Sequence, residues 1–176
     1  MTNVFVSIGS NISREQYITN ALCALEVAFG SLQLSSVYES EAVGFAGDNF
    51  YNLVVGFETD LSVGALTQRL KEIEADNGRV HGCAKFSART LDIDILTFDQ
   101  VVGNISGVEL PRQEITENAF VLLPLSEIAA SELHPVLKEA YSNLWSAYSK
   151  KQLLWPVDFV WKQTKISLCD KSKLKG

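Results

Sequence analysis

A pair of carboxylates separated by one residue is the first feature of this sequence that could do chemistry. Asp92 and Asp94 lie in the run Arg-Thr-Leu-Asp-Ile-Asp-Ile at residues 89–95. On a β-strand, side chains two positions apart point to the same face, with roughly 6.5–7 Å between their Cα atoms. A strand here would turn both carboxylates to one side and the apolar residues between them to the core. Converging carboxylates bind divalent cations, and Mg²⁺ bound in this way also contacts substrate phosphates.

Basic residues immediately before this pair point to phosphate chemistry. Arg79, Lys85 and Arg89 lie within residues 79–89, and His81, which can titrate near neutral pH, lies among them. Arginines beside a metal site neutralise the charge that develops when a phosphoryl or pyrophosphoryl group is transferred. Two simpler interpretations stay open. The carboxylates could form the polar face of a half-buried strand, and the arginines could be solvated or paired with those aspartates.

An amide and two aromatic rings could form a site for a heterocycle. Asn52 presents both a donor and an acceptor, which is the pairing needed to recognise the edge of a heterocyclic ring. Phe50, two positions earlier, and Phe120 could stack on such a ring. A structural role is the commoner use of all three residues, with the amide bonded to backbone and the rings packed in the core.

The composition is that of a globular chain with an acidic balance. The chain has 176 residues, a mass of 19.4 kDa, 47% hydrophobic residues and a net charge of −6. This length favours one domain that needs no disulfide or structural metal, and the acidic balance argues against a general nucleic-acid binder. P-loop and Rossmann motifs are absent. Three cysteines without paired spacing, no signal peptide and no transmembrane stretch predict a cytoplasmic protein that does not contact a membrane.

The hydrophobic pattern predicts the elements that would position these residues. Short apolar, β-branched runs predict strands at residues 4–9, 32–38, 50–58 and 90–98. Apolar residues at helical spacing predict helices at residues 14–29 and between Asp60 and Asn77. Beyond the last strand we expect a loop with at most a short hairpin over residues 99–119, helices after Pro124 and Pro135, and a peripheral or frayed tail from Lys162 onward.

The order of these elements, strand-helix-strand twice over, favours an α+β fold of the ferredoxin-like type with a mostly antiparallel sheet. Short joins in the middle allow antiparallel pairing, and the helices near the C-terminus are appended to this core. A doubly wound parallel sheet is the alternative, and it would need more crossover helices than the pattern contains. We predict a single domain over residues 1–150 and a peripheral extension over residues 151–176.

Several of these segments together resemble the 6-hydroxymethyl-7,8-dihydropterin pyrophosphokinase family. The run Arg-Thr-Leu-Asp-Ile-Asp-Ile is a far more specific signature than two aspartates alone. The resemblance covers about residues 2–145 and includes four further segments: Gly9-Ser10-Asn11, Phe50-Tyr51-Asn52, residues 74–79 and residues 119–125. Members of that family transfer pyrophosphate from ATP to the hydroxymethyl group of a pterin in folate synthesis, with two Mg²⁺ ions. The resemblance therefore implies this activity and the family's fold, a ferredoxin-like α/β/α sandwich.

The resemblance also implies a role for each matched residue. Asp92 and Asp94 would hold both Mg²⁺ ions, and the other catalytic residues would be Arg79 and Arg89. The implied contacts to the pterin are Ser40, Val43, Phe50, Asn52 and Phe120. The implied contacts to the nucleotide are Glu74, His81, Ile95 and Arg112. The expected partners are the pterin and ATP, without nucleic acid or membrane, and we expect a monomer or a weak homodimer.

Most departures from the family pattern fall on the nucleotide side. Pro111 is followed by Arg112 rather than by histidine, and Asn118 replaces the usual arginine before the Ala-Phe pair. Further departures are His81, Phe86, Gly107, Glu109 and, in the pterin loop, Glu41. Three hypotheses follow. The chain is a working pyrophosphokinase, or a divergent paralogue that binds a pterin with weak or no transfer or uses a different pterin, or a ferredoxin-like module without a small-molecule site.

Overall fold

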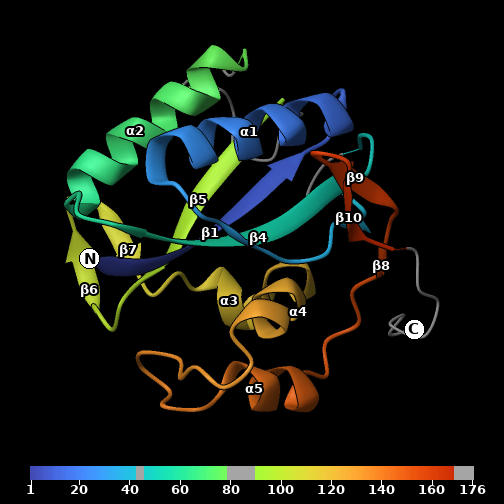
Figure 1. Ribbon diagram of the computed structural model, residues 1–176. Coiled ribbons are helices and arrows are strands. Elements are labelled where there is room, and N and C mark those ends of the chain that lie inside the picture. The colour runs from blue at the N-terminus through green and yellow to red at the C-terminus, as the bar shows by residue number, and fades with distance from the viewer. Residues whose placement is uncertain (43–45, 79–89, 169–176) are drawn as a thin grey trace.

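An antiparallel sheet lies at the centre of the fold, with helices on both of its faces (Figure 1). The structure is a computed structural model that describes residues 1–42, 46–78 and 90–168. Its elements in chain order are β1 (Thr2–Ser10), α1 (Arg14–Phe29), β2 (Gln33–Leu34), β3 (Tyr38–Ser40), β4 (Phe50–Thr59), α2 (Val63–Asp76), β5 (Asp92–Phe98), β6 (Gly103–Ile105), β7 (Val108–Leu110), α3 (Glu114–Glu117), α4 (Ala119–Ile128), α5 (Tyr141–Ala147), β8 (Leu154–Pro156), β9 (Phe159–Trp161) and β10 (Thr164–Ser167).

The strands of the central sheet run in the order β5-β1-β4-β3-β8, and β2 also pairs with β4. Every pair of neighbours in this sheet is antiparallel. The register places Gly9 of β1 directly opposite Asn52 of β4 on one side and opposite Asp92 of β5 on the other. The predicted mixture of helices with an antiparallel sheet is therefore confirmed, and the doubly wound parallel alternative is wrong.

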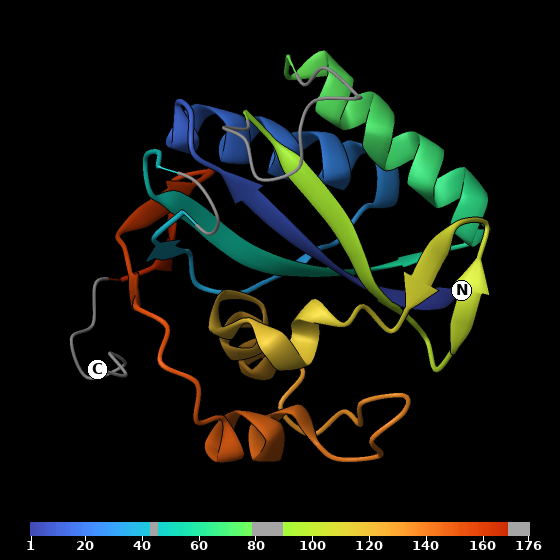
Figure 2. The ribbon, with the colours of Figure 1, turned by 180° about the vertical axis from the view of Figure 1, so that it is seen from behind.

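The helices α1 and α2 form where the apolar spacing predicts them. α1 buries Ile18, Leu22 and Leu25 at helical spacing and ends at Gly30, whose φ of 80° suits a residue without a side chain. α2 begins after Ser62, whose hydroxyl accepts a hydrogen bond from a backbone amide of the first turn. Both helices pack on the same face of the sheet (Figure 2).

The helices α3, α4 and α5 lie on the opposite face (Figures 1 and 2). Phe5, Val54 and Leu96, from the three neighbouring strands β1, β4 and β5, are buried there against Leu122 and Tyr141. Because side chains alternate along each strand, these strands present apolar residues to both helical layers. A polar residue on either face is consequently positioned by the helices above it as well as by its own strand.

The strand predicted at residues 32–38 is correct only in part, because the chain forms the two short strands β2 and β3 instead. Between them, the amide of Ser35 donates to the Val54 carbonyl (3.1 Å) and its hydroxyl accepts from the Val54 amide (2.9 Å). A side chain therefore replaces one backbone group of the ladder and divides the strand. The short hairpin allowed for residues 99–119 is confirmed as β6 and β7, whereas α3 was not predicted.

Two predicted helix starts are wrong. Pro124 lies inside α4 rather than before it. A proline inside a helix removes one backbone hydrogen bond, but α4 buries most of its apolar residues under the sheet, and this packing outweighs the cost. α5 begins at Tyr141 rather than directly after Pro135. The cause is His134, whose Nδ1 accepts hydrogen bonds from two backbone amides within the next three residues and turns the chain before the helix.

The segment after residue 150 carries strands, and within the tail predicted to be peripheral or frayed from Lys162 onward, residues 164–167 form β10. β8 pairs with β3 at the edge of the central sheet, and β9 and β10 form a hairpin. Phe159 is buried in the same core as α1, and the hydroxyl of Ser167 donates to the Val37 carbonyl (3.2 Å). The domain boundary at residue 150 stays a prediction. In the described parts of the chain, no helix has both the length and the hydropathy needed to cross a membrane.

Candidate active site

One row of residues crosses the sheet at the end of β1 and contains two predicted site residues. Asn52 and Asp92 lie on either side of Gly9, and Tyr38 lies beyond Asn52. Residues directly opposite one another in an antiparallel sheet point to the same face. Asp94, two positions after Asp92, shares this face, whereas the alternate residues Leu91, Ile93 and Ile95 are buried on the side of α1 and α2. Asn52 and both carboxylates therefore lie on the face covered by α4.

The side chain of Asn52 is held in one orientation. It is buried, and its Nδ2 donates to the Ser40 hydroxyl (2.8 Å) and to the Tyr38 carbonyl (3.3 Å). Its Oδ1 faces Gly9, since a Cβ placed on Gly9 would lie 3.7 Å from this atom and 3.7 Å from the ring of Phe50. The missing side chain of Gly9 therefore leaves space beside an amide acceptor and the edge of an aromatic ring.

Tyr38 connects this row to α4. Its hydroxyl donates to Glu127, whose other carboxylate oxygen accepts from the Ser36 hydroxyl (2.9 Å). Burial, and then the hydrogen bond and charge of Glu127, raise the pKa of Tyr38 well above its ordinary value, so the phenol stays neutral. This contact holds α4 against β3. Phe120 of α4 packs beside the buried Tyr38 and so lies on the same side of the sheet as Asn52.

Arg112, predicted to contact the nucleotide, lies against one of the predicted metal ligands. Its guanidinium is 3.2 Å from the Asp94 carboxylate and 3.4 Å from that of Glu114. Its backbone amide also donates to the Leu96 carbonyl of β5 (2.8 Å). The arginine is thus fixed to the acidic strand by its backbone, while its side chain remains partly exposed.

Two other residues predicted on the nucleotide side have structural contacts. Glu74 of α2 is buried, and its Oε2 accepts a hydrogen bond from the Ile93 amide (2.9 Å). This bond attaches the helix to the strand that carries Asp92 and Asp94. The side chain of Ile95 is 4% exposed and packs in the core under α1 and α2. Its side chain therefore lies on the other face of β5 from the two carboxylates.

The carboxylates present a donor set that fits Mg²⁺. Asp92 and Asp94 share a face and are only partly buried. Within residues 1–42, 46–78 and 90–168, no group of three or more His, Cys, Asp or Glu side chains could enclose a metal ion. Mg²⁺ commonly takes one or two carboxylates and completes its shell with water and substrate phosphates, so two carboxylates on one face are sufficient.

Comparison with known proteins decides the family. The profile of the family described as 7,8-dihydro-6-hydroxymethylpterin-pyrophosphokinase (HPPK) matches residues 5–130. The chain belongs to the HPPK family. It is 33% identical over 141 residues to the 2-amino-4-hydroxy-6-hydroxymethyldihydropteridine pyrophosphokinase of Aquifex aeolicus, a match that covers 79% of this chain and 88% of that one. It is also 33% identical over 147 residues to the Bacillus subtilis protein of the same name, covering 81% and 85%.

Solved structures share the HPPK fold. The crystal structure of wild-type Plasmodium falciparum HPPK-DHPS superposes with a TM-score of 0.68 at 14% identity and covers 95% of this chain. The chain spans about half the length of that longer protein, since it covers 50% of it. At this level of identity the likeness concerns the fold alone.

Several residues of the predicted HPPK site lie outside the described part of the chain. These are Val43, Arg79, His81 and Arg89. Their implied roles stay predictions. Among the described residues, the structure brings together Ser40, Phe50, Asn52, Asp92, Asp94, Phe120 and Arg112 on the α4 side of the sheet.

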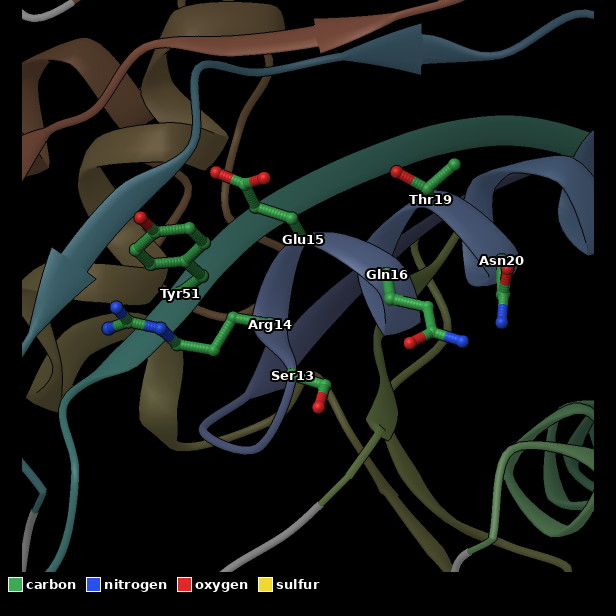
Figure 3. Close-up of a pocket in the computed structure, with 7 residues that line it drawn as sticks. All are labelled: Ser13, Arg14, Glu15, Gln16, Thr19, Asn20 and Tyr51. Atoms are coloured by element: carbon green, nitrogen blue, oxygen red, sulfur yellow. The ribbon is translucent and has the colours of Figure 1, made fainter.

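A network that the sequence does not reveal lies at the other face of β4. Arg14 of α1 donates to Glu39 (2.6 Å) and to the Asn49 carbonyl (3.0 Å), and its guanidinium lies 4.0 Å from the centre of the Tyr51 ring. Figure 3 shows Arg14 beside Tyr51 at one end of an open groove along α1, with a volume of about 650 Å³. Trp155 of β8 donates to the second oxygen of Glu39 (2.9 Å). No spacing in the sequence signals these contacts, because they join segments far apart along the chain.

Proposed function

We propose that this chain transfers pyrophosphate from ATP to the hydroxymethyl group of 6-hydroxymethyl-7,8-dihydropterin in folate synthesis. The observation that carries this proposal is the row Asn52-Gly9-Asp92. In this row Gly9 of β1 lies between the Asn52 amide on β4, which could bind a heterocycle, and the carboxylate pair on β5. The relatives at 33% identity are named for this reaction and are matched over 85% or more of their length. Amide and carboxylates are thus spaced to hold two substrates that react with each other.

The amide side of the row would bind the pterin. The Oδ1 of Asn52 accepts from a ring N–H, and the hydrogen bond to Ser40 keeps this oxygen facing the space left by Gly9. Phe50 and Phe120 flank the ring and stack on it. Val43 adds a further contact. A rigid amide favours a heterocycle with the matching edge, because a ligand without that N–H leaves a buried acceptor unpaired.

The carboxylate side would hold the triphosphate. In the reaction, the hydroxymethyl oxygen forms a bond to the β-phosphorus of ATP and loses its proton to solvent, the bond from that phosphorus to the α,β-bridging oxygen breaks, and AMP leaves. Two Mg²⁺ ions held by Asp92 and Asp94 would neutralise charge on the phosphate oxygens. Arg112, already 3.2 Å from Asp94, contacts the same phosphates, and Arg79 and Arg89 neutralise charge on the leaving AMP. His81 adds a phosphate contact, and Glu74 and Ile95 support the strand beneath the nucleotide.

A paralogue that binds a pterin without transfer is not favoured. The departures from the family pattern remove cations on the nucleotide side, but Arg112 supplies one next to Asp94. We further propose that the fold is the ferredoxin-like α/β/α sandwich, a proposal supported by the strand order β5-β1-β4-β3 with helical layers on both faces. The monomer or weak homodimer stays a prediction.

An assay for AMP tests the activity. The purified chain with ATP, Mg²⁺ and 6-hydroxymethyl-7,8-dihydropterin is expected to release AMP in proportion to pterin consumed. Asp92→Asn and Asp94→Asn should each abolish release while pterin binding, followed by calorimetry, persists. Asp60→Asn, at an exposed carboxylate outside the segments of the proposed site, is the matched control and should leave the rate unchanged. No AMP from the wild-type chain, with pterin binding intact, contradicts the proposal.

A further inference from the structure

A second cavity lies on the α4 and α5 side of the sheet, at the end of β5 away from Asp92. Its volume is about 390 Å³, and small-molecule sites commonly fall between about 300 and 1,000 Å³. It lies between the paired residues Phe5 and Thr97 of β1 and β5 on one side and the chain that leads into α5 on the other. The pair Ser7 and Asp94 lies further along the same two strands, so this cavity is separate from the proposed active site.

The floor of this cavity combines an aromatic ring with two hydroxyl groups. Phe5 is 1% exposed, Thr97 is 3% exposed and Tyr141 is 2% exposed, and all three line the cavity. Neither hydroxyl has a hydrogen-bond partner within the described chain, and both are accessible from the cavity rather than sealed. A hydroxyl that opens into a cavity can be reached by water or by a bound molecule. A ligand with a polar atom at its inner end would take the place of that water.

The rim of the cavity is negatively charged. Asp99 and Glu132 both line it, and neither forms an ion pair with a lysine or arginine of the described residues. One oxygen of Asp99 accepts from the Asn3 amide (2.8 Å), which leaves the other available. Partial burial raises the pKa of Glu132, and the charge of Asp99 raises it further, against a lowering contribution from Asn3. Two carboxylates without a counter-charge disfavour phosphates and favour a cation.

We propose that this cavity binds a small organic cation, such as an amidinium or primary ammonium group on a short apolar body. The apolar body packs on Phe5, the cationic group lies between Asp99 and Glu132, and a polar atom reaches the hydroxyls of Thr97 and Tyr141. A bare metal ion fits less well, because the Phe5 ring on the floor offers it no ligand, whereas the same ring packs against the apolar body of an organic cation.

Titration of the full-length chain with benzamidine tests this assignment, and benzamide, its neutral isostere, is the paired probe. Calorimetry should give one saturable site for benzamidine with a Kd of about 1 mM or below, and binding of benzamide about tenfold weaker or absent, since a charged hydrogen bond is lost. Glu132→Gln and Thr97→Val should each weaken benzamidine binding several-fold. Thermal unfolding of each variant reports whether it is folded, and Asp99→Asn offers a second carboxylate variant, because asparagine tolerates the φ of 46° at this position.

Two controls locate the site. Glu72→Gln removes an exposed carboxylate on α2 and should leave benzamidine affinity unchanged. Asp94→Asn should also leave it unchanged, because the active-site carboxylates are not used. The proposal is overturned by three outcomes: no saturable binding to the wild-type chain, equal affinity for benzamidine and benzamide, or loss of binding in Asp94→Asn rather than in Glu132→Gln.

Discussion

The Arg112 guanidinium lies 3.2 Å from the Asp94 carboxylate, with both side chains about a third exposed, at 30% and 35%. An ion pair with this exposure contributes at most about 1 kcal/mol to the free energy of unfolding. Stability therefore explains little of its position between the acidic strand and Glu114, 3.4 Å away, which agrees with the proposal that Arg112 holds phosphate. A pair this weak can also rearrange at little cost when a substrate binds.

Replacing Arg112 should affect the nucleotide and not the pterin. We expect Arg112→Gln to lower kcat/KM for ATP by about 10- to 100-fold, the loss of one charge-assisted hydrogen bond to phosphate. KM for the pterin and the thermal midpoint should change little. Steady-state AMP release measures the two kinetic constants, and thermal unfolding measures the midpoint. Arg69→Gln, on the exposed side of α2, is the matched control. A kcat/KM for ATP within twofold of wild type would show that Arg112 does not contact the nucleotide.

Gly9 should be required for the pterin and not for the fold. In Gly9→Ala the new Cβ lies 3.7 Å from Asn52 Oδ1 and from the Phe50 ring, an ordinary contact that leaves the strand intact. It occupies the space beside the amide acceptor, so we expect pterin affinity by calorimetry to fall by about tenfold, the value of one hydrogen bond to a polar ligand.

A second glycine provides the contrast. A Cβ on Gly56 would lie 2.8 Å from a ring carbon of Phe5 and 2.9 Å from Gln33. Gly56→Ala should therefore lower the free energy of unfolding by about 1–3 kcal/mol, through overpacking, with pterin affinity retained in the folded fraction. A stable Gly56→Ala together with an unfolded Gly9→Ala would contradict the conclusion that a methyl group fits at position 9 and overpacks at position 56.

Local features of this site could be predicted and long-range ones could not. The shared face of Asp92 and Asp94 follows from the period of two along a strand, and the structure has it. The register that puts Gly9 between Asn52 and Asp92 depends on how three strands pair, and a slip by two residues would keep every side chain on its face, so the alternation does not select it. Likewise, the core position of Ile95 follows from alternation, whereas the bond from the Ile93 amide to Glu74 depends on how α2 packs.

Trp155 should support the pterin side from a distance. Its indole donates to Glu39, 116 positions earlier in the chain, and Glu39 also accepts from Arg14, which donates to the Asn49 carbonyl. These contacts hold Glu39, next to Ser40, and Asn49, next to Phe50, in place. We expect Trp155→Phe to raise KM for the pterin about 3- to 10-fold, by loosening the positions of Ser40 and Phe50, without changing KM for ATP.

The matched control for this change is Trp161→Phe. The indole of Trp161 donates to Cys23 (3.4 Å) and has no contact with Glu39, so its replacement should leave both KM values unchanged. Equal effects of the two variants on KM for the pterin would assign the loss to general destabilisation of the C-terminal strands.

Stability should fall with acidification because of His134. Its imidazole is buried, and its Nδ1 accepts hydrogen bonds from the amides of Val136 (3.2 Å) and Leu137 (3.1 Å), so the neutral ring is the one that the fold requires. Burial lowers the pKa of His134 in the folded chain. Below about pH 6.5, the ordinary pKa of histidine, the unfolded chain therefore binds a proton that the folded chain does not.

The free energy of unfolding should consequently decrease as the pH falls from about 7 toward the lowered pKa of His134. Glu132 acts in the opposite direction, because its raised pKa favours proton uptake by the folded chain, and Glu132→Gln separates the two contributions. Urea denaturation at a series of pH values measures the slope. His134→Asn keeps an acceptor but cannot titrate, so it should flatten the slope, whereas His81→Gln, at the other of the two histidines, should retain it. An unchanged slope in His134→Asn would mean that the titration of another group sets the acid sensitivity.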